Sequence, residues 1–224
     1  MRPNFNIDDS HTKYYNTHGI EVPSATTILK LLNKPQLVKW ANYLGFNSLN
    51  VDSVLNEAST LGTHIHNLIN AILNNYYIIY INREELPSDV VYSYINRFKQ
   101  WLNINTLEPI LLEKSITSDK FGGTLDCYGI LNGKYTIIDF KTSKKIYLTM
   151  FFQLALYTIL LEEKGYPVEQ VGILLVNPKI TSNNEKYIDR EKLQPYIDFV
   201  KKLVDLFHDY DFINKSDKWN NNIV

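Results

Sequence analysis

The sequence predicts an α/β protein in which helices fill the first half and a mixed β-sheet the second. Two observations support this. Up to about residue 105, apolar residues recur mainly three and four positions apart, and beyond it they alternate with a period of two. The later segments follow in the order βββαβ and then a helix, which is an α/β layer arrangement. We therefore expect a single domain over 1–224, with an N-terminal helical lobe over about 1–105, a core over about 106–178 and a C-terminal helix over about 190–210.

The N-terminal lobe is expected to hold a short hairpin and four helices. Residues 13–22 alternate in polarity and can turn at His18-Gly19. The apolar run at 76–81 fits either an extension of the third helix or a buried strand. The four helices are expected at residues 25–32, 35–45, 52–75 and 89–103.

The ends of these helices follow from residues with capping chemistry. Ser24 and Ser88 suit the N-cap position, because a hydroxyl oxygen accepts a hydrogen bond from an unpaired N–H of the first turn. Pro35 fits the start of the second helix and Gly45 its end. The Asp-Ser pair at 52–53 is expected to begin the third helix.

The second half of the chain shows strand patterns separated by one apolar helix. Asn132-Gly133 between two alternating runs predicts a hairpin with a type I′ turn, since both central residues of that turn need a positive φ. The segment 148–165 is apolar almost all round, so we expect a buried helix. The polar tail at 215–224 is expected to fray. The remaining elements are strands at 108–117, 123–132, 134–143 and 168–178, and an amphipathic helix at 191–209.

Composition excludes several classes of protein. Hydrophobic residues are 45% of the chain, which is enough to bury a sizeable core. The net charge of −1 excludes a uniformly basic coat for nucleic acid, although not a local basic patch. A single cysteine, Cys127, excludes a disulfide framework, a Cys-rich zinc module and a four-cysteine iron–sulfur cluster. No apolar signal or membrane-spanning run occurs, so we expect a soluble intracellular protein without a membrane partner.

The most informative stretch surrounds the second hairpin. The Asn132-Gly133 turn sets a register in which Asp126 and Asp139 lie directly opposite one another on the same face. Opposed like charges destabilise a sheet, and a divalent cation is the economical compensation. A period of two then places Lys141 on the same face as Asp139. Two carboxylates and a lysine are thus expected to converge at one spot.

A plainer interpretation is a strand that ends in solvated charges at the surface. The apolar pair at 137–138 argues against it, because it predicts a strand buried on both faces, with a desolvated Asp139 and with Phe140 in the opposite layer. Zinc hydrolysis has little support, since His64 and His66 are two apart and point in different directions on a helix. No P-loop or G-x-G-x-x-G motif indicates nucleotide chemistry.

These residues belong to a longer pattern. Gly-Thr-Leu-Asp at 123–126 is followed by Ile-Ile-Asp-Phe-Lys at 137–141 and Gln-Leu-Ala-Leu-Tyr at 153–157. This order resembles the PD-(D/E)XK nuclease superfamily, above all the RecB-type nuclease domains and phage-type exonucleases. Upstream, Gly-Thr-His-Ile-His at 62–66 is similar to the G-x-x-x-H element of those subfamilies. The resemblance covers about residues 24–176 and implies a restriction-endonuclease-like mixed β-sheet core flanked by helices.

The resemblance implies a metal site for Mg²⁺ or Mn²⁺. Asp126 and Asp139 would bind the metal through their carboxylates, together with the backbone carbonyl of Phe140. His66 would be a further ligand, although a histidine on an apolar helix is more often a core residue. Glu113 on the first core strand would contact the metal or a metal-bound water, or else is an exposed strand residue.

The same resemblance implies roles in catalysis. Lys141 would orient or activate the attacking water. Gln153 and Tyr157, four apart on one helix face, would position the substrate backbone or Lys141. A buried structural amide is the alternative for Gln153.

The function implied is a Mg²⁺- or Mn²⁺-dependent deoxyribonuclease, an exonuclease rather than an endonuclease. Its expected partner is single- or double-stranded DNA, with a second copy of the chain or recombination and replication proteins as further candidates, in the cytoplasm of a bacterium or a phage-infected cell. The alternatives are a catalytically silent nucleic-acid-binding scaffold and a nuclease for RNA. Trp40, Tyr43 and Phe46 could stack on bases, but their helical spacing favours ordinary core packing.

Overall fold

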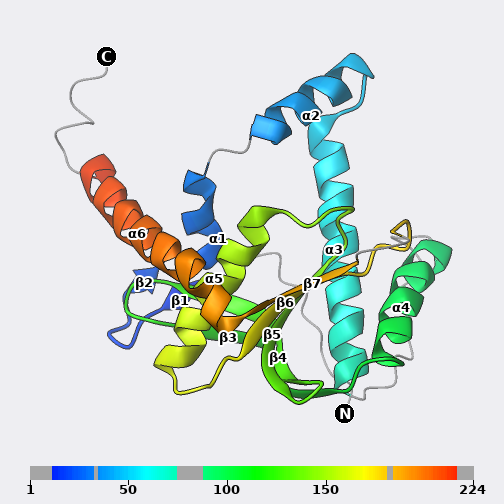
Figure 1. The fold of residues 1–224 in the computed structure, drawn as a ribbon. Helices are drawn as coiled ribbons and strands as arrows, with labels where there is room; N and C mark the ends of the chain where they lie inside the picture. The colour runs from blue at the N-terminus through cyan, green and yellow to red at the C-terminus, as the bar shows by residue number, and fades with distance from the viewer. Residues whose placement is uncertain (1–11, 33–34, 75–87, 181–183, 216–224) are drawn as a thin grey trace, which may run out of the picture.

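The computed structural model describes residues 12–32, 35–74, 88–180 and 184–215. Its centre is a five-stranded sheet with the strand order β3-β4-β5-β6-β7 (Figure 1). β5 and β6 are parallel, and the other neighbouring pairs of this sheet are antiparallel, so the expected mixed sheet is confirmed. The strands are β3 (Leu107–Thr117), β4 (Gly122–Leu131), β5 (Lys134–Lys141), β6 (Gln170–Leu175) and β7 (Glu185–Asp189).

The register of the central hairpin is the one that its turn predicts. Cys127 pairs with Ile138, and Leu131 pairs with Lys134. The two turn residues between them have φ values of 48° and 85°, as a type I′ turn requires. A shift of one residue would have turned every side chain of β5 to the wrong face of the sheet.

The edge strand β7 was not expected from the sequence. Its five residues, Glu-Lys-Tyr-Ile-Asp, are mostly polar and carry three charges, so they lack the apolar alternation of the inner strands. Charged side chains are common on edge strands because they discourage pairing with other chains. The end of the segment predicted at 168–178 also differs, since β6 stops at Leu175.

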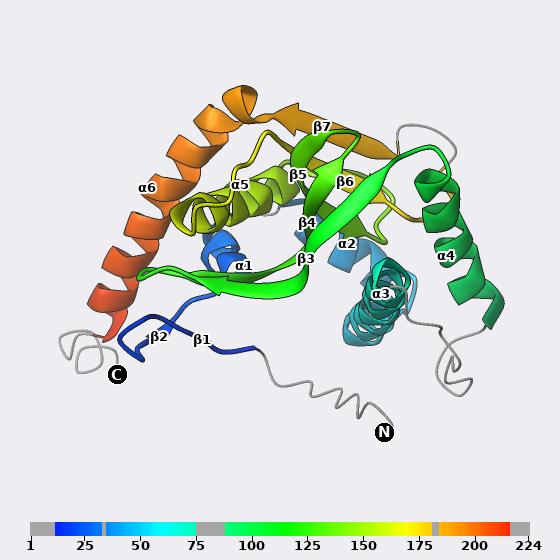
Figure 2. The same cartoon turned by 90° about the horizontal axis from the view of Figure 1, so that it is seen from below.

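Helices cover both faces of the sheet (Figure 2). One face is covered by α1 (Ala25–Ile28), α5 (Leu148–Glu163) and α6 (Arg190–Lys215), which share a core with the strands. The other is covered by α3 (Val51–Leu73) and α4 (Ser88–Leu102). The N-terminal helices are therefore divided between the two faces.

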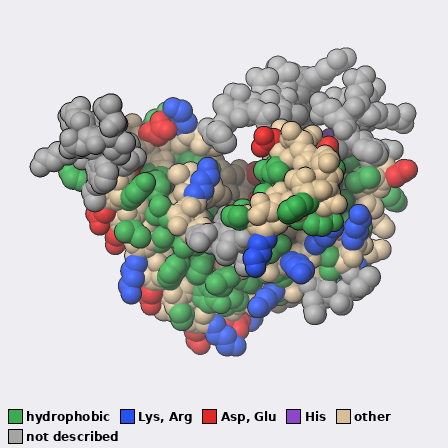
Figure 3. Space-filling view, turned by 90° about the horizontal axis from the view of Figure 1, so that it is seen from above, with side chains coloured by type: hydrophobic (Ala, Val, Ile, Leu, Met, Phe, Trp, Pro, Cys, Tyr) green, Lys and Arg blue, Asp and Glu red, His purple; other side chains and the backbone are tan. Residues whose placement is uncertain are grey.

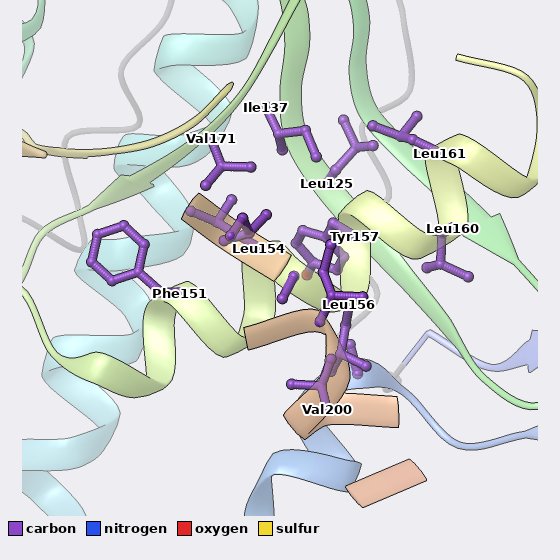
Figure 4. Close-up of a cluster of buried hydrophobic side chains, with 14 of the residues drawn as sticks. Leu125, Ile137, Phe151, Leu154, Leu156, Tyr157, Leu160, Leu161, Val171 and Val200 are labelled. Atoms are coloured by element: carbon purple, nitrogen blue, oxygen red, sulfur yellow. The ribbon is translucent and has the colours of Figure 1, made fainter. Parts of the chain in front are cut away.

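The first core is built around α5, which is apolar on all sides because it lies between the sheet and α6. Leu154 and Leu156 of α5 are completely buried. Figure 4 shows them with Ile137 from β5 and Val200 from α6. The prediction of a buried helix here is confirmed. Its N-cap residue is Tyr147, which does not have the short polar side chain usual at that position.

The second core joins α3 and α4 to the opposite face of the sheet. Ile65 and Ile69, four apart on α3, are fully buried. Phe98 of α4 meets Phe140 of β5 edge to face, with ring centroids 5.4 Å apart. Phe140 thus points into the layer expected from the alternation of its strand.

Several N-terminal details differ from expectation. The N-cap of α3 is Asn50, whose side chain accepts a hydrogen bond from the N–H of Ser53, rather than a residue at 52–53. Gly45 lies inside α2 (Pro35–Phe46), and the positive φ after this helix, 56°, falls on Ser48. Asn side chains cap helices as well as Asp or Ser do, which makes such starts ambiguous by a few residues.

Other N-terminal expectations are confirmed. Ser24 caps α1, accepting from the N–H of Thr27 at 3.0 Å, and the 3₁₀ helix η1 (Leu29–Leu31) continues it. The hairpin of β1 (Tyr14–Tyr15) and β2 (Glu21–Val22) forms at the expected place. The undecided run at 76–81 and the tail after residue 215 lie outside the described residues.

Candidate metal-binding site

Three side chains from different elements meet at one point beside the sheet. His66 comes from α3, Glu113 from β3 and Asp126 from β4, and one possible ligand atom of each lies within 4.8 Å of the other two. His66 Nδ1 is 3.3 Å from Asp126 Oδ1 and 4.0 Å from Glu113 Oε1. The sequence predicted that these three residues belong to one site, and the structure brings them together.

The position of Asp126 follows from a divergence of two strands. The ladder between β4 and β5 ends at the pair Cys127–Ile138. Asp126 and Asp139 come next in the register, but their backbones are not paired. Asp126 Oδ2 instead accepts the backbone N–H of Phe140 at 2.8 Å. This bond matters because a buried N–H without an acceptor costs free energy. The Asp126 carboxylate thereby supplies the acceptor that a backbone carbonyl supplies elsewhere in the ladder.

Glu113 lies at an irregular point of β3. Its neighbours Leu112 and Lys114 pair with Cys127 and Leu125, whereas Glu113 itself has a φ of 44°. A positive φ is rare for a residue with a side chain and costs about 1–3 kcal/mol. The register on both sides is unbroken and places Glu113 opposite Asp126 of β4, so the two carboxylates meet in the cluster.

His66 reaches the cluster because α3 is held close to the sheet. The buried Ile65 and Ile69 fix the helix against the strands, and this leaves His66 only partly exposed, at 24% of its side chain. At Gly62, an added Cβ would lie 3.7 Å from the Thr142 hydroxyl, so the helix passes just beyond the end of β5. A larger residue such as alanine would therefore fit at position 62.

A second group adjoins the cluster on the α5 side of the sheet. Lys141 Nζ lies 2.8 Å from Asp139 Oδ1, which it hydrogen-bonds, and 2.7 Å from Oδ2. Lys141 Nζ also contacts Gln153 Oε1 at 3.5 Å, and Gln153 Nε2 donates to the Tyr157 hydroxyl at 2.8 Å. The expected shared face of Asp139 and Lys141 is confirmed, and so is the pairing of Gln153 with Tyr157.

The Tyr157 ring explains the glycine that opens the motif at 123–126. A Cβ built on Gly123 would lie 2.5 Å from a ring carbon of Tyr157, which is closer than real Cβ contacts occur. Any larger residue at 123 would push the ring away and with it the Gln153 amide. Gly123 is thus a positioning residue for the chain of contacts that ends at Lys141.

The titratable groups of the site shift one another. Burial lowers the pKa of His66, but the adjacent Asp126 carboxylate overcomes this and raises it to about 9. Burial raises the pKa of Glu113 to about 7, with a further contribution from the charge of Asp126. Burial also raises the pKa of Asp139 to about 6, against the pull of Lys141. Clusters of mutually perturbed groups are typical of functional sites.

The cluster fits a divalent cation bound by oxygen and nitrogen. Octahedral ligands about 2.1 Å from an ion lie about 3 Å apart when adjacent and about 4 Å apart when opposite, and the distances of His66 to Asp126 and Glu113 fall near that range. Two carboxylates would offset the charge of the ion. Asp139 lies outside the three-residue cluster, and both of its carboxylate oxygens are within 2.8 Å of Lys141 Nζ.

Phe140 and His64 lie outside the three-residue cluster. Phe140 contributes its N–H to Asp126, while the role expected for its carbonyl stays a prediction. His64 Nε2 is buried and has no hydrogen-bond partner among the described residues. As their spacing predicts, His64 is not part of the cluster that contains His66.

One residue that positions the site was not recognised from the sequence. Asn177 is buried, and its side-chain amide donates to the backbone carbonyl of Thr142 at 2.8 Å. The N–H of Val176 also donates to the carbonyl of Lys141 at 2.9 Å. These bonds hold the end of β5 against the chain that follows β6. The available signal was a polar residue directly after the apolar run of β6.

No family model matches the chain, and no curated protein matches it. Among solved structures it is similar to that of SSO0001, with 17% sequence identity and a TM-score of 0.41, over 88% of this chain and 79% of the other. Within the described residues, no helix is long and apolar enough to cross a membrane.

Proposed function

We propose that the protein is a metal-dependent nuclease that hydrolyses phosphodiester bonds of DNA. The observation that supports this best is the meeting of His66, Glu113 and Asp126 at ligand distances, directly beside the ion pair of Asp139 and Lys141. A divalent ion bound there would lower the pKa of a water molecule and neutralise charge on the phosphate.

The protein residues would divide the remaining work. Lys141 carries a fixed positive charge, since its pKa is raised by Asp139 and Asp126 despite burial, and it would hold an attacking water or a phosphate oxygen. Gln153 and Tyr157 would limit the movement of its ammonium group. The buried carboxylate of Asp139 would keep Lys141 oriented. The finer assignments of an exonuclease and a restriction-endonuclease-like fold rest on the resemblance of the motifs.

The direct test is a time course on end-labelled single- and double-stranded DNA with Mg²⁺, with Mn²⁺ and with EDTA. The key variant is Lys141→Met, which keeps the length of the side chain and removes its charge. We expect a loss of about 100-fold or more, the usual effect of deleting one electrostatic contact to a transition state. Stepwise release of nucleotides from one end would indicate an exonuclease, and fragments cut within the strand from the start would indicate an endonuclease.

Lys134→Met is the matched control. Lys134 lies at the other end of the same strand and also pairs with an aspartate, Asp189, at 3.1 Å, but both are about half exposed. Exposed pairs contribute little, so cleavage should stay at the wild-type rate. Cleavage by Lys141→Met at the wild-type rate would contradict the proposed site. A wild-type protein that binds DNA but cleaves neither DNA nor RNA with either metal would indicate the silent scaffold instead.

A further inference from the structure

Helix α2 presents an unusual stripe of exposed side chains. Lys39, Tyr43 and Phe46 are spaced by four and three residues, so they lie along one face of the helix. Tyr43 is 63% exposed and Phe46 is 90% exposed, while Lys39 is also exposed. Leu44 of the same helix is buried. We call Lys39, Tyr43 and Phe46 the α2 stripe.

Core packing does not account for these aromatic rings. The helical spacing favoured that explanation for Tyr43 and Phe46, and their exposure contradicts it. A phenylalanine that leaves nine-tenths of its surface in water gains almost no hydrophobic stabilisation from its own fold. Single exposed apolar residues are ordinary, but two aromatic rings in line with a lysine form a surface with a specific chemistry.

The charge around the stripe favours a polyanion. Between Glu21 and Asp52 the sequence has three lysines and no acidic residue, although acidic residues slightly outnumber basic ones over the whole chain. Two of these lysines, Lys30 and Lys39, are exposed. The segment that holds η1 and α2 thus carries a local excess of positive charge in the sequence that the net charge of −1 conceals.

The stripe lies on the helix that precedes the one carrying His66. α2 is at the N-terminal end of α3, whose later turns carry His66 (Figure 1). The surface seen from above is hollowed between the side that carries α2 and the side that carries α6, with hydrophobic side chains exposed around it (Figure 3). A strand bound on α2 would thus lie beside the N-terminal end of α3.

We propose that the α2 stripe binds a single strand of DNA by stacking unpaired bases on Tyr43 and Phe46, with Lys39 next to the phosphates. Bases in a duplex have no free faces, so a ring on a projecting helix can stack only on an unpaired strand or end. The inference rests on the proposed function for the kind of ligand. It adds a preference for single-stranded substrate and the residues responsible for it.

The test measures binding apart from cleavage. Fluorescence anisotropy with a labelled oligothymidylate in EDTA gives the affinity of wild type and of Tyr43→Ala/Phe46→Ala. Each stacked base contributes enough that the double variant should bind roughly 10- to 100-fold more weakly. The matched control is Tyr210→Ala/Phe212→Ala, a pair of similarly exposed rings on α6, at 56% and 77%, and it should bind like wild type.

Each outcome has a separate meaning. Wild-type affinity in Tyr43→Ala/Phe46→Ala, equal weakening by both variants, or no preference of the wild type for a single strand over a duplex would overturn the proposal. Conversion of a wild-type oligomer to a monomer by the α2 variant, with DNA affinity unchanged, would identify the stripe as a contact between copies and also overturn it. Weakened binding together with no cleavage by the wild type would reject the nuclease and leave the stripe supported.

Discussion

Replacing Asp126 by Asn should lower the pKa of His66. The substitution keeps an oxygen that can accept the Phe140 N–H, as Asp126 now does at 2.8 Å. It removes the negative charge 3.3 Å from His66 Nδ1. Structure and charge are thus separated in one variant, which deletion to alanine would not achieve.

The magnitude follows from the balance of forces on His66. Burial lowers its pKa, and the charge and hydrogen bonding of Asp126 raise it to about 9, above the ordinary 6.5. That difference corresponds to roughly 3 kcal/mol. Without the Asp126 charge, burial prevails, and we expect the pKa of His66 to fall below 6.5. Because the folded-state pKa in the wild type is raised, its stabilising effect is complete below pH 6.5 and is lost as the pH rises through 9.

The assay is an NMR titration of the histidine rings in metal-free protein, with the His66 signal assigned by its loss in His66→Gln. The chain has five histidines, so the spectrum is simple enough to follow each ring. Denaturant unfolding at pH 6.5 and pH 9 should show the stability advantage of wild type over Asp126→Asn shrinking by about 3 kcal/mol across that window. A wild-type His66 that titrates near 6.5, or one that still titrates near 9 in Asp126→Asn, would refute this reasoning.

Two further predictions concern packing. Gly123→Ala should displace the Tyr157 ring, whose carbon lies 2.5 Å from the added Cβ, and lower DNA cleavage about 10-fold or more while the far-UV circular dichroism is retained; unchanged kinetics would show that the ring position is unimportant. Leu154→Ala removes a fully buried side chain from the α5 core and should cost about 2–5 kcal/mol of unfolding free energy, measured with urea, whereas a loss below 1 kcal/mol would mean that the core closes over the gap.

Local pattern was sufficient to predict much of the fold and part of the site. The Asn132-Gly133 turn determined the register, and the alternation of β5 placed Asp139 with Lys141 and sent Phe140 to the opposite face. These features depend on residues close together in the chain. They could be predicted because a turn type and a period of two leave few alternatives.

Features that depend on distant packing were not predictable in the same way. The sequence alone indicates that Asp126 and Asp139 are opposite, but not that the strands separate there and turn Asp126 toward His66. That separation coincides with the positive φ of Glu113, which no propensity indicates. The exposure of Phe46 was hidden for a related reason, since helical spacing describes a face without saying what covers it.

The hydrogen bond from Phe140 to Asp126 has a consequence for how the protein tolerates change. Because a side chain rather than a backbone carbonyl completes the ladder at this point, insertion or deletion of one residue in β4 between Cys127 and the turn would cost the hydrogen bond and misplace the cluster at the same time. The number of residues between Cys127 and the turn is therefore fixed by the position of the site. Insertions and deletions should be tolerated more readily at the edge strand β7 than in this part of β4.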